Sequence, residues 1–406
     1  MIYDVIIIGG GPAGLMAANV LESHHINYLL IEKNERVGKK ILLTGGKRCN
    51  VTNHLLVPDF IDALHMKHKR FLYHALKSFG PQEVVSFFKS KGLNLLLEQG
   101  FKYFPETGKS QSVVDALTQS INPQHMILSS AVQKITFNQN IFHVSTNKSD
   151  YQSKILLLAT GSNAYPTIGS SGDGLKFATH LGIPYKPFTP AETSVYSNEA
   201  LSLFKDLQGF SLEGVKVTVP RLKASYKESL LFTHFGLSGP VILHMSELIH
   251  HAIVEGDNNI ILSFIDYSEE ALKTLILSHI KEKLSTFLQI LLPKKMALKL
   301  LLISGIKDVN LSEISKKDMA SLIDLLIRFP LKIDHVESIE KAFVNAGGII
   351  ADGINPKTMA TKKIPQLYVA GELTDLQGPI GGFNITIALS TGRLAAYSMV
   401  EALSKQ

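Results

Sequence analysis

A glycine cluster near the N-terminus constrains the fold of this chain more than any other feature. Residues 9–14 read Gly-Gly-Gly-Pro-Ala-Gly, directly after the β-branched run of residues 3–8 and at the start of a predicted helix over residues 12–23. In this G-x-G-x-x-G pattern the glycines allow a tight turn and a close approach to a pyrophosphate, whose charge faces the free N–H groups of the helix N-terminus. The pattern predicts a dinucleotide-binding βαβ unit.

The second predicted strand, residues 28–32, narrows the choice of dinucleotide. Glu32 lies 18 residues beyond Gly14, where a carboxylate can accept a hydrogen bond from a ribose 2′-hydroxyl. The same carboxylate disfavours a 2′-phosphate. The start of the chain therefore favours FAD or NAD and not NADP.

Three later segments favour FAD over NAD. Residues 156–161 form a predicted strand ending in an Ala-Thr-Gly turn typical of two-dinucleotide-binding flavoproteins. Residues 367–372 resemble their late strand, whose terminal acid, here Glu372, holds the ribityl chain. Residues 381–384, Gly-Gly-Phe-Asn, precede an apolar helix whose dipole would stabilise negative charge on a reduced flavin. The alternative for this last segment is an ordinary Asn-capped helix.

Composition and charge exclude several classes of protein. The 406 residues are 45% apolar and 19% charged, which excludes a disordered chain, collagen and a disulfide scaffold and allows two or three domains. The formal net charge of +6 fits either a polyanionic partner or simple solubility. The single cysteine, Cys49, cannot form an internal disulfide, and no apolar run reaches the roughly 20 residues of a membrane span. We expect a soluble cytoplasmic protein without membrane contact, and the oligomeric state stays open.

The pattern along the chain separates two α/β ends from a different middle. Residues 60–92 are helical in pattern, residues 194–264 alternate as β structure, and residues 269–329 are again helical. From residue 346 onward the chain returns to glycine-punctuated α/β structure. We therefore expect one discontinuous α/β domain with the middle of the chain inserted into it.

Four longer motifs carry a resemblance to a known family. They are GKKILLTGGKRCNVTN at residues 38–53, FTHFGLSGP at 232–240, NAGGI at 345–349 and NPKTM at 355–359. With these runs the chain resembles the bacterial flavoprotein family of BaiN/RdsA-like, or aminoacetone-oxidase-like (YhiN-type), NAD(P)/FAD-dependent oxidoreductases. Two departures concern the substrate side: Lys47 stands where glycine is usual, and Gln-Gly-Pro-Ile before the Gly-Gly pair is uncommon.

The resemblance implies an α/β fold in three parts. An FAD-binding Rossmann-like core of the glutathione-reductase type would comprise residues 1–190 and 345–406. A β-barrel-like substrate domain would comprise residues 191–268 and 331–344, and a small helical lid residues 269–330. The resemblance also implies that the loops at residues 44–53 and 234–240 lie around the flavin.

The motifs and the resemblance together predict a set of FAD-binding residues and no metal site. The predicted FAD-binding residues are Gly9, Gly11, Pro12, Ala13, Gly14, Glu32, Lys33, Lys40, Thr44, Gly45, Gly46, Asn50, Val132, Ala159, Thr160, Gly161, Gly371, Glu372, Gly381, Gly382, Phe383, Asn384 and Ile385.

Four residues are candidates for catalysis: Arg48, Cys49, His234 and Ser238. Cys49 could protonate a carbanion, since the adjacent Arg48 would lower its pKa towards working pH. The alternative is that Cys49 is a small buried hydrophobe. His234 is in the same way either functional or a structural histidine.

Three classes of function fit these features. The first is reduction of an activated C=C bond, in which a hydride from flavin N5 goes to the carbon β to a carbonyl and a proton to the α carbon. The resemblance includes members that act on uracil in ribosomal RNA, giving dihydrouridine, and on unsaturated bile-acid intermediates. The second is oxidation of a small amine such as aminoacetone, with oxygen reoxidising the flavin. The third is a binding protein in which the flavin is only structural.

Basic segments favour the RNA substrate. Residues 67–73, 294–295 and 316–317 would suit RNA phosphates, although each is also typical of a solvated helix face. The helical residues 269–329 could form a movable lid over an extruded uridine. We therefore expect a uracil in 23S ribosomal RNA as the substrate.

NADH or NADPH is expected as a transient electron donor. No second G-x-G-x-x-G follows a predicted strand, and residues 169–174 form a turn-rich loop without that spacing. A separate nicotinamide-binding domain is therefore not expected. The nicotinamide would enter at the same flavin face and leave before the substrate binds.

Overall fold

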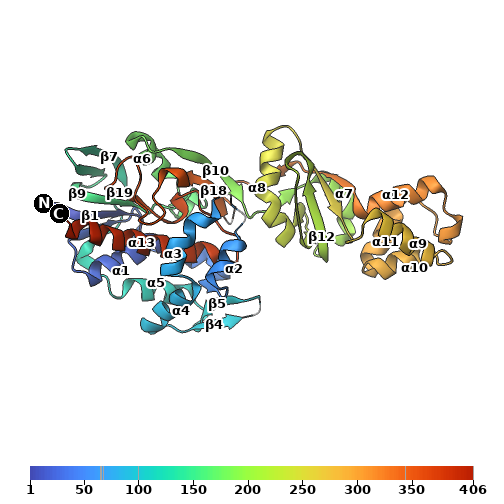
Figure 1. The fold of residues 1–406 in the computed structure, drawn as a ribbon, viewed down its shortest axis with the longest axis horizontal. Helices are drawn as coiled ribbons and strands as arrows, with labels where there is room; N and C mark the ends of the chain where they lie inside the picture. The colour runs from blue at the N-terminus through green and yellow to red at the C-terminus, as the bar shows by residue number, and fades with distance from the viewer. Residues whose placement is uncertain (65, 67, 99, 343, 406) are drawn as a thin grey trace. The chain divides into compact units, whose positions relative to one another are not determined.

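The computed structural model describes residues 1–64, 66, 68–98, 100–342 and 344–405, and it divides into two compact units (Figure 1). Unit 1 comprises residues 1–189 and 344–406, and unit 2 comprises residues 190–343. Each unit has its own cluster of buried apolar side chains. The chain therefore leaves unit 1 once and returns to it once. The predicted boundaries of a β-barrel-like domain and a separate helical lid stay a prediction.

A mostly parallel sheet forms the core of unit 1. Its strands follow the order β6 (Met126–Ile127), β2 (Tyr28–Ile31), β1 (Ile2–Ile8), β9 (Asp150–Leu158), β8 (Ile141–Thr146) and β7 (Val132–Asn138), with β19 (Leu367–Val369) also paired to β9. The pairs β6–β2, β2–β1, β1–β9 and β9–β19 are parallel, whereas β7, β8 and β9 form an antiparallel meander. The buried β-branched residues of β1 are typical of a strand covered on both faces. This arrangement confirms the predicted α/β fold with a Rossmann-type core.

Helices and two small sheets surround this core in unit 1. The helices are α1 (Pro12–Ser23), α2 (Val57–Asp62), α3 (Tyr73–Ser78), α4 (Pro81–Ser90), α5 (Ser110–Thr118), α6 (Asp173–Leu181) and α13 (Phe383–Ser404). One small sheet has the order β3 (Thr52–Asn53), β5 (Lys102–Pro105), β4 (Leu95–Glu98), and the other pairs β10 (Tyr185–Ala191) with β18 (Val344–Ile349). The helical pattern of residues 60–92 corresponds to three short helices, since Gly80 and Pro81 start a new one at α4.

Unit 2 contains a seven-stranded sheet and six helices among its described residues. The strand order is β16 (Phe329–Lys332), β15 (Asn259–Ser263), β12 (Ser211–Val219), β13 (Ala224–Phe232), β14 (Gly236–Ser238), β11 (Val195–Tyr196) and β17 (His335–Val336). Only two residues separate β16 from β17, the two edges of this order, so the sheet has to curl towards closure. The helices are α7 (Asn198–Phe204), α8 (Pro240–Val254), α9 (Glu269–Ser278), α10 (Leu284–Leu291), α11 (Lys294–Ser304) and α12 (Lys316–Ile327).

The longest helix of unit 1, α13, lies directly against α1 (Figure 1). A Cβ added to Gly392 of α13 would overlap the backbone of Ala13 in α1. The two helices can approach this closely only because residue 392 has no side chain. Among the described helices, none combines the length and apolarity needed to cross a membrane.

Replacing Gly392 with alanine should lower the melting temperature, although alanine is the better helix former. Helix propensity alone would stabilise the variant by about 1 kcal/mol. The clash with the Ala13 backbone opposes this, and overpacking typically costs about 1–3 kcal/mol and more where backbone has to shift. A thermal melt of G392A beside the wild type measures the sign. An unchanged or raised melting temperature would show that the α1–α13 contact is not tight.

Candidate functional site

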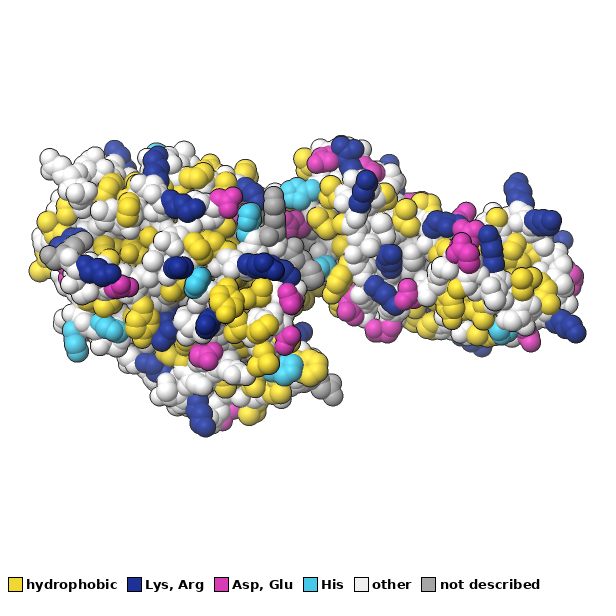
Figure 2. All heavy atoms as spheres, viewed as in Figure 1, with side chains coloured by type: hydrophobic (Ala, Val, Ile, Leu, Met, Phe, Trp, Pro, Cys, Tyr) yellow, Lys and Arg dark blue, Asp and Glu magenta, His cyan; other side chains and the backbone are white. Residues whose placement is uncertain are grey.

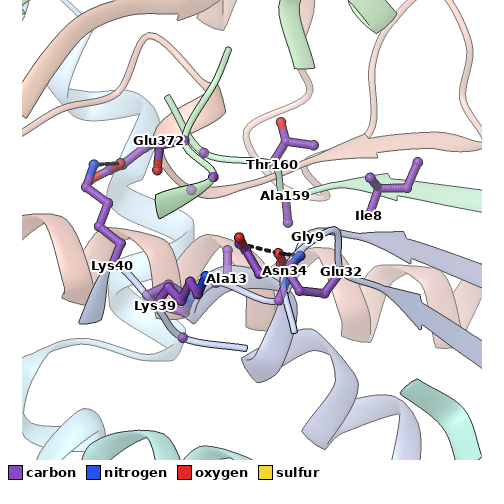
Figure 3. A pocket seen from close by; sticks show the side chains of 18 of the residues that line it. Ile8, Gly9, Ala13, Glu32, Asn34, Lys39, Lys40, Ala159, Thr160 and Glu372 are labelled. Atoms are coloured by element: carbon purple, nitrogen blue, oxygen red, sulfur yellow. Dashed lines mark hydrogen bonds and ion pairs between the residues drawn. The ribbon is translucent and has the colours of Figure 1, made fainter. Parts of the chain in front are cut away.

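A pocket in unit 1 opens at the carboxyl ends of the parallel strands. Its walls come from residues that follow β1, β2, β9 and β19, together with the first turns of α1 and α13 (Figure 3). This is the edge at which open α/β sheets bind ligands. The empty space is about 1140 Å³, part of it open to solvent.

Most of the predicted FAD-binding residues line this pocket. Those that do are Gly9, Gly11, Pro12, Ala13, Glu32, Lys33, Lys40, Thr44, Val132, Ala159, Thr160, Gly161, Gly371, Glu372, Asn384 and Ile385. Six others lie outside the lining: Gly14, Gly46, Asn50, Gly381, Gly382 and Phe383. The direct contact of all these residues with FAD stays a prediction.

The glycine turn after β1 leaves an open cradle at the N-terminus of α1. Gly9 has a φ of +107°, and a Cβ there would overlap the Ala159 carbonyl, so glycine is required at this position. A Cβ on Gly11 would meet no atom within 4 Å, because this residue faces open space. Gly11 is also the N-cap of α1, and no side chain caps the helix. The N-terminal dipole is therefore available to an anionic ligand such as a pyrophosphate.

Glu32 is fixed at the end of β2 by hydrogen bonds to both of its carboxylate oxygens. The Gly10 amide donates to Oε2 at 2.7 Å, and the Asn34 backbone amide donates to Oε1 at 2.9 Å. The Asn34 side chain donates to Oε1 as well, at 2.6 Å (Figure 3). The side chain is 8% exposed and lines the pocket. The carboxylate is thus oriented with remaining acceptor capacity, as binding of a ribose hydroxyl requires.

An ion pair crosses the other end of the pocket. Lys40 Nζ lies 2.6 Å from Glu372 Oε2, and the Ser162 hydroxyl donates to the same oxygen at 3.2 Å (Figure 3). Both charged side chains were predicted to contact the cofactor, but their pairing was not predicted. The pair places one donor and one acceptor at the pocket wall, which suits the phosphate and hydroxyl groups of a dinucleotide.

Sequence reasoning missed one wall of the pocket, residues 168–173 at the start of α6. Lys33 Nζ forms an ion pair with Asp173 at 2.7 Å, and Asn34 donates to the Ile168 carbonyl at 3.2 Å. Lys33 lowers the pKa of Asp173, against the opposing effect of burial, which is the largest single influence. In the sequence, this loop is notable only for its glycines, which lack the spacing of a second dinucleotide-binding motif. Its one available signal in the sequence is an acid, Asp173, between two glycines.

The N-terminus of α13 is held against β3. Gly382 is the N-cap of α13 with a φ of +83°, and a Cβ there would overlap the backbone of Thr52. Asn384 does not cap the helix; its side chain instead bonds both the N–H and the carbonyl of Gly378, at 2.9 and 2.7 Å. The Asn-capped alternative is therefore wrong, and the uncapped dipole of α13 begins at the pocket, which Asn384 and Ile385 line.

Among the described residues of the loop 44–53, Thr44 is the one that lines the pocket. Cys49 is 0% exposed, and burial raises the pKa of its thiol to about 12. The expected lowering of this pKa by Arg48 is wrong, because Arg48 is directed to an ion pair with Glu98 and lies 4.4 Å above the Phe104 ring. Gly46 is exposed, and the surroundings of Gly45 lie outside the described part of the chain.

Three further predicted residues have contacts that explain their positions. In the amide orientation that satisfies its neighbours, Asn50 accepts a hydrogen bond from the Gly382 N–H at 3.0 Å. His234, in the turn between β13 and β14, and Ser238, the last residue of β14, belong to unit 2. The Ser238 hydroxyl lies 2.8 Å from that of Ser194, and the His234 ring packs edge-on against Phe235.

A buried hydroxyl group in the pocket also supports FAD as the ligand. Thr160 Oγ1 is buried, lines the pocket and has no hydrogen-bond partner among the described residues. A buried hydroxyl without a partner is costly, and a polar group of the cofactor would satisfy it. The described residues contain no cluster of side chains able to hold a metal ion.

Comparisons with known proteins agree with this site. The parallel sheet with its glycine cradle and two uncapped helix N-termini is typical of the Rossmann-type flavoproteins, and the chain is an FAD-dependent oxidoreductase. The chain belongs to the family described as HI0933-like protein Rossmann domain, which matches residues 3–398.

Three relatives align with nearly the whole chain. Identity is 27% over 405 residues to the Ribosomal RNA dihydrouridine synthase of Escherichia coli (strain K12), covering 99% of each chain. It is 29% to the protein of that name from Haemophilus influenzae, covering 99% of this chain and 98% of the relative. It is 27% to the 3-dehydro-bile acid delta(4,6)-reductase of Clostridium scindens, covering 97% and 98%.

A solved structure shares the fold. The 3-ketosteroid-delta4-(5alpha)-dehydrogenase from Rhodococcus jostii RHA1 superposes with a TM-score of 0.52 at 13% identity, covering 98% of this chain and 96% of that chain. At this identity the likeness concerns the fold alone.

Replacing Glu32 with glutamine should weaken FAD binding. The amide would turn a donor towards the Gly10 N–H or the ribose, and a hydrogen bond to a charged group contributes about 1.5–3 kcal/mol. The dissociation constant for FAD should rise by about 10- to 150-fold, measured by flavin fluorescence titration of the apoprotein. Glu35→Gln is the matched control, since Glu35 is exposed and pairs only with Lys39 on the surface. Equal affinities for E32Q and wild type would refute the assignment.

Proposed function

We propose that this enzyme reduces the C=C bond of a uracil in 23S ribosomal RNA to give dihydrouridine, with NADH or NADPH as the electron source. The observation that carries the chemistry is the uncapped N-terminus of α13 at the pocket, which can stabilise negative charge on the cofactor. The substrate is supported by two full-length relatives named Ribosomal RNA dihydrouridine synthase.

The related bile-acid reductase supports the same reaction class. Its name describes reduction of the double bonds at ring positions 4 and 6 of a 3-dehydro compound. These C=C bonds are conjugated to the carbonyl at position 3. Uracil presents the same arrangement. A small conjugated ketone is therefore the second candidate substrate. The match to an amine oxidase covers only 9% of this chain and does not favour amine oxidation.

The reaction divides between cofactor and protein. Once reduced by NADH or NADPH, a bound FAD would supply the hydride that the carbon β to the carbonyl needs when the π bond breaks. The α carbon then takes one proton, so that two new C–H bonds replace the π bond. The chain has to bind the base, exclude water and hold the proton donor. Gly9, Gly11 and Glu32 would hold the cofactor's ADP half, and Lys40 with Glu372 its middle.

The observations distinguish among the candidate proton donors. Cys49 keeps its proton at neutral pH, but its complete burial favours the packing role. Arg48 is engaged by Glu98 and would act as a binding group at most. We therefore propose His234, in the turn between β13 and β14, as the proton-donating group; Ser238 is the last residue of β14.

Basic side chains support an RNA substrate. In unit 1, Lys69 and Arg70 precede the exposed Tyr73, while Lys67 lies outside the described residues. In unit 2, residues 294–295 and 316–317 are lysine pairs in the first turns of α11 and α12. The helix dipole disfavours cations at that end. Local helix stability therefore does not favour these lysines, whereas they would suit RNA phosphates.

Purified protein should convert uracil in unmodified 23S ribosomal RNA to dihydrouridine when NADH or NADPH is supplied. Mass spectrometry of nuclease fragments locates the added two hydrogens. The same protein without nicotinamide is the control. If the RNA stays unchanged while a 3-keto-4-ene steroid is reduced, the substrate is the small conjugated ketone.

Replacing His234 with glutamine should lower the rate of dihydrouridine formation by about 100-fold or more, as expected for loss of a general acid. Cys49→Ala should leave the rate within a few-fold of wild type. Flavin absorbance checks that both variants retain FAD. The reverse result, with C49A inactive and H234Q active, would identify Cys49 as the donor.

A further inference from the structure

Two aromatic rings form a stack on the surface of unit 1. The Phe101 and His54 ring centroids lie 4.3 Å apart with only 16° between the ring planes. Phe101 is 61% exposed, so one face of its ring covers the imidazole and much of the rest is open to solvent. Figure 2 shows hydrophobic side chains and a histidine gathered over the tip of the β4–β5 hairpin. We call the Phe101–His54 pair the ring stack.

The backbone holds the ring stack in an unusual conformation. Phe101 has a φ of +62°, in the left-handed region that bulky residues rarely adopt. The His54 N–H donates to the Phe101 carbonyl at 3.2 Å, and Asn53 pairs with Lys102 in the β3–β5 ladder. Strain of this kind is concentrated at functional sites. The backbone thus directs the Phe101 ring outward. Apolar packing within the fold does not explain this exposed position.

The ring stack adjoins the start of α13, which lines the pocket. The Asn53 side chain donates to the Gly381 carbonyl at 3.2 Å. Lys102, next to Phe101, has its Cε 3.6 Å from the position that a Cβ on Gly381 would take. Gly381 directly precedes the N-cap of α13. A nucleic-acid strand that enters the pocket at this end would therefore pass the ring stack.

The charge beside the ring stack suits a phosphate. Lys102 makes no ion pair with any residue that the structure describes, whereas Arg48, in the loop before β3, is neutralised by Glu98 of β4. A flat exposed ring next to a cation matches a nucleotide, whose base stacks and whose phosphate pairs with the ammonium group. A protein or lipid partner would instead use the aliphatic side chains of the hairpin, Leu96 and Leu97, which are also exposed.

We propose that Phe101, His54 and Lys102 form a nucleotide-binding subsite for single-stranded RNA: a base stacks on Phe101 and its phosphate pairs with Lys102. The subsite rests on the proposed function and would hold a nucleotide that flanks the reduced uracil. The occupant is recognised by stacking and charge and not by base identity, because every base has a flat face.

Binding of fluorescein-labelled decauridine, followed by fluorescence anisotropy on the FAD-loaded enzyme, tests the subsite. Phe101→Ala should weaken binding by roughly 5- to 150-fold, the range for loss of one stacked base. Phe101→Trp should restore it. Lys102→Gln should reduce the slope of log affinity against log salt by about 0.7, the value for one phosphate contact on a single strand.

Leu97→Ala is the matched control, since Leu97 is 50% exposed on the same hairpin but lies outside the ring stack. It should bind decauridine as the wild type does, and all variants should keep the flavin spectrum. An equal loss in L97A and F101A would show a general apolar surface for a protein or lipid and would overturn the subsite. Unchanged binding by F101A, or no binding by the wild type, would also overturn it.

Dihydrouridine formation in 23S ribosomal RNA separates the two proposals. If the wild type reduces the RNA and F101A does so with unchanged KM, the subsite is wrong and the proposed function stands. If decauridine binding depends on Phe101 and Lys102 while no RNA is reduced, the subsite stands and the proposed function is wrong. A raised KM with unchanged kcat in F101A supports both.

Discussion

The structure of unit 1 depends on close approach of backbone to backbone around the β1–α1 turn. Gly9 lies against the carbonyl of Ala159, Gly14 against Gly9, and Gly392 against Ala13, and a Cβ at any of these glycines would overlap its neighbour. These contacts connect β1, β9, α1 and α13 without intervening side chains. The pocket is the space that remains at the open end of this tightly packed group. The spacing of the elements around the pocket is therefore set by backbone contacts, which, unlike side chains, have no alternative rotamers.

The uncapped N-termini of α1 and α13 give the pocket its electrostatic character. Both α1 and α13 begin at a glycine N-cap without a capping side chain, and neither has an acid in its first turn. The positive ends of the two dipoles are left for the ligand to balance. Two lysines nearby are already paired, Lys40 with Glu372 and Lys33 with Asp173. Besides the helix dipoles, the pocket therefore offers one buried carboxylate, Glu32, which N–H donors hold in place.

The predictable part of the site is the part encoded within a few residues. The glycine cluster and Glu32 could be recognised because their spacing along one βαβ unit fixes their meeting point. The Lys33–Asp173 pair joins residues 140 positions apart, and no local pattern indicates such a contact. For Cys49, the prediction from its sequence neighbour is wrong. Its sequence neighbour Arg48 points to Glu98 and Phe104, and the thiol titrates according to burial and not to adjacency. The curling sheet of unit 2 was likewise implied only by resemblance, since its pairing order is far from the chain order.

The chain order of the two units has a consequence for synthesis. The last wall of the pocket, from Gly371 to the first turn of α13, follows unit 2 in the sequence. A ribosome therefore delivers the glycine cradle first, then all of unit 2, and only at the end the strand and helix that complete the cofactor site. Until then β9 lacks its partner β19, and α1 lacks the covering helix α13. A chain truncated before residue 371 would lack this wall of the pocket and would expose the apolar face of α1 as a target for chaperones or proteases.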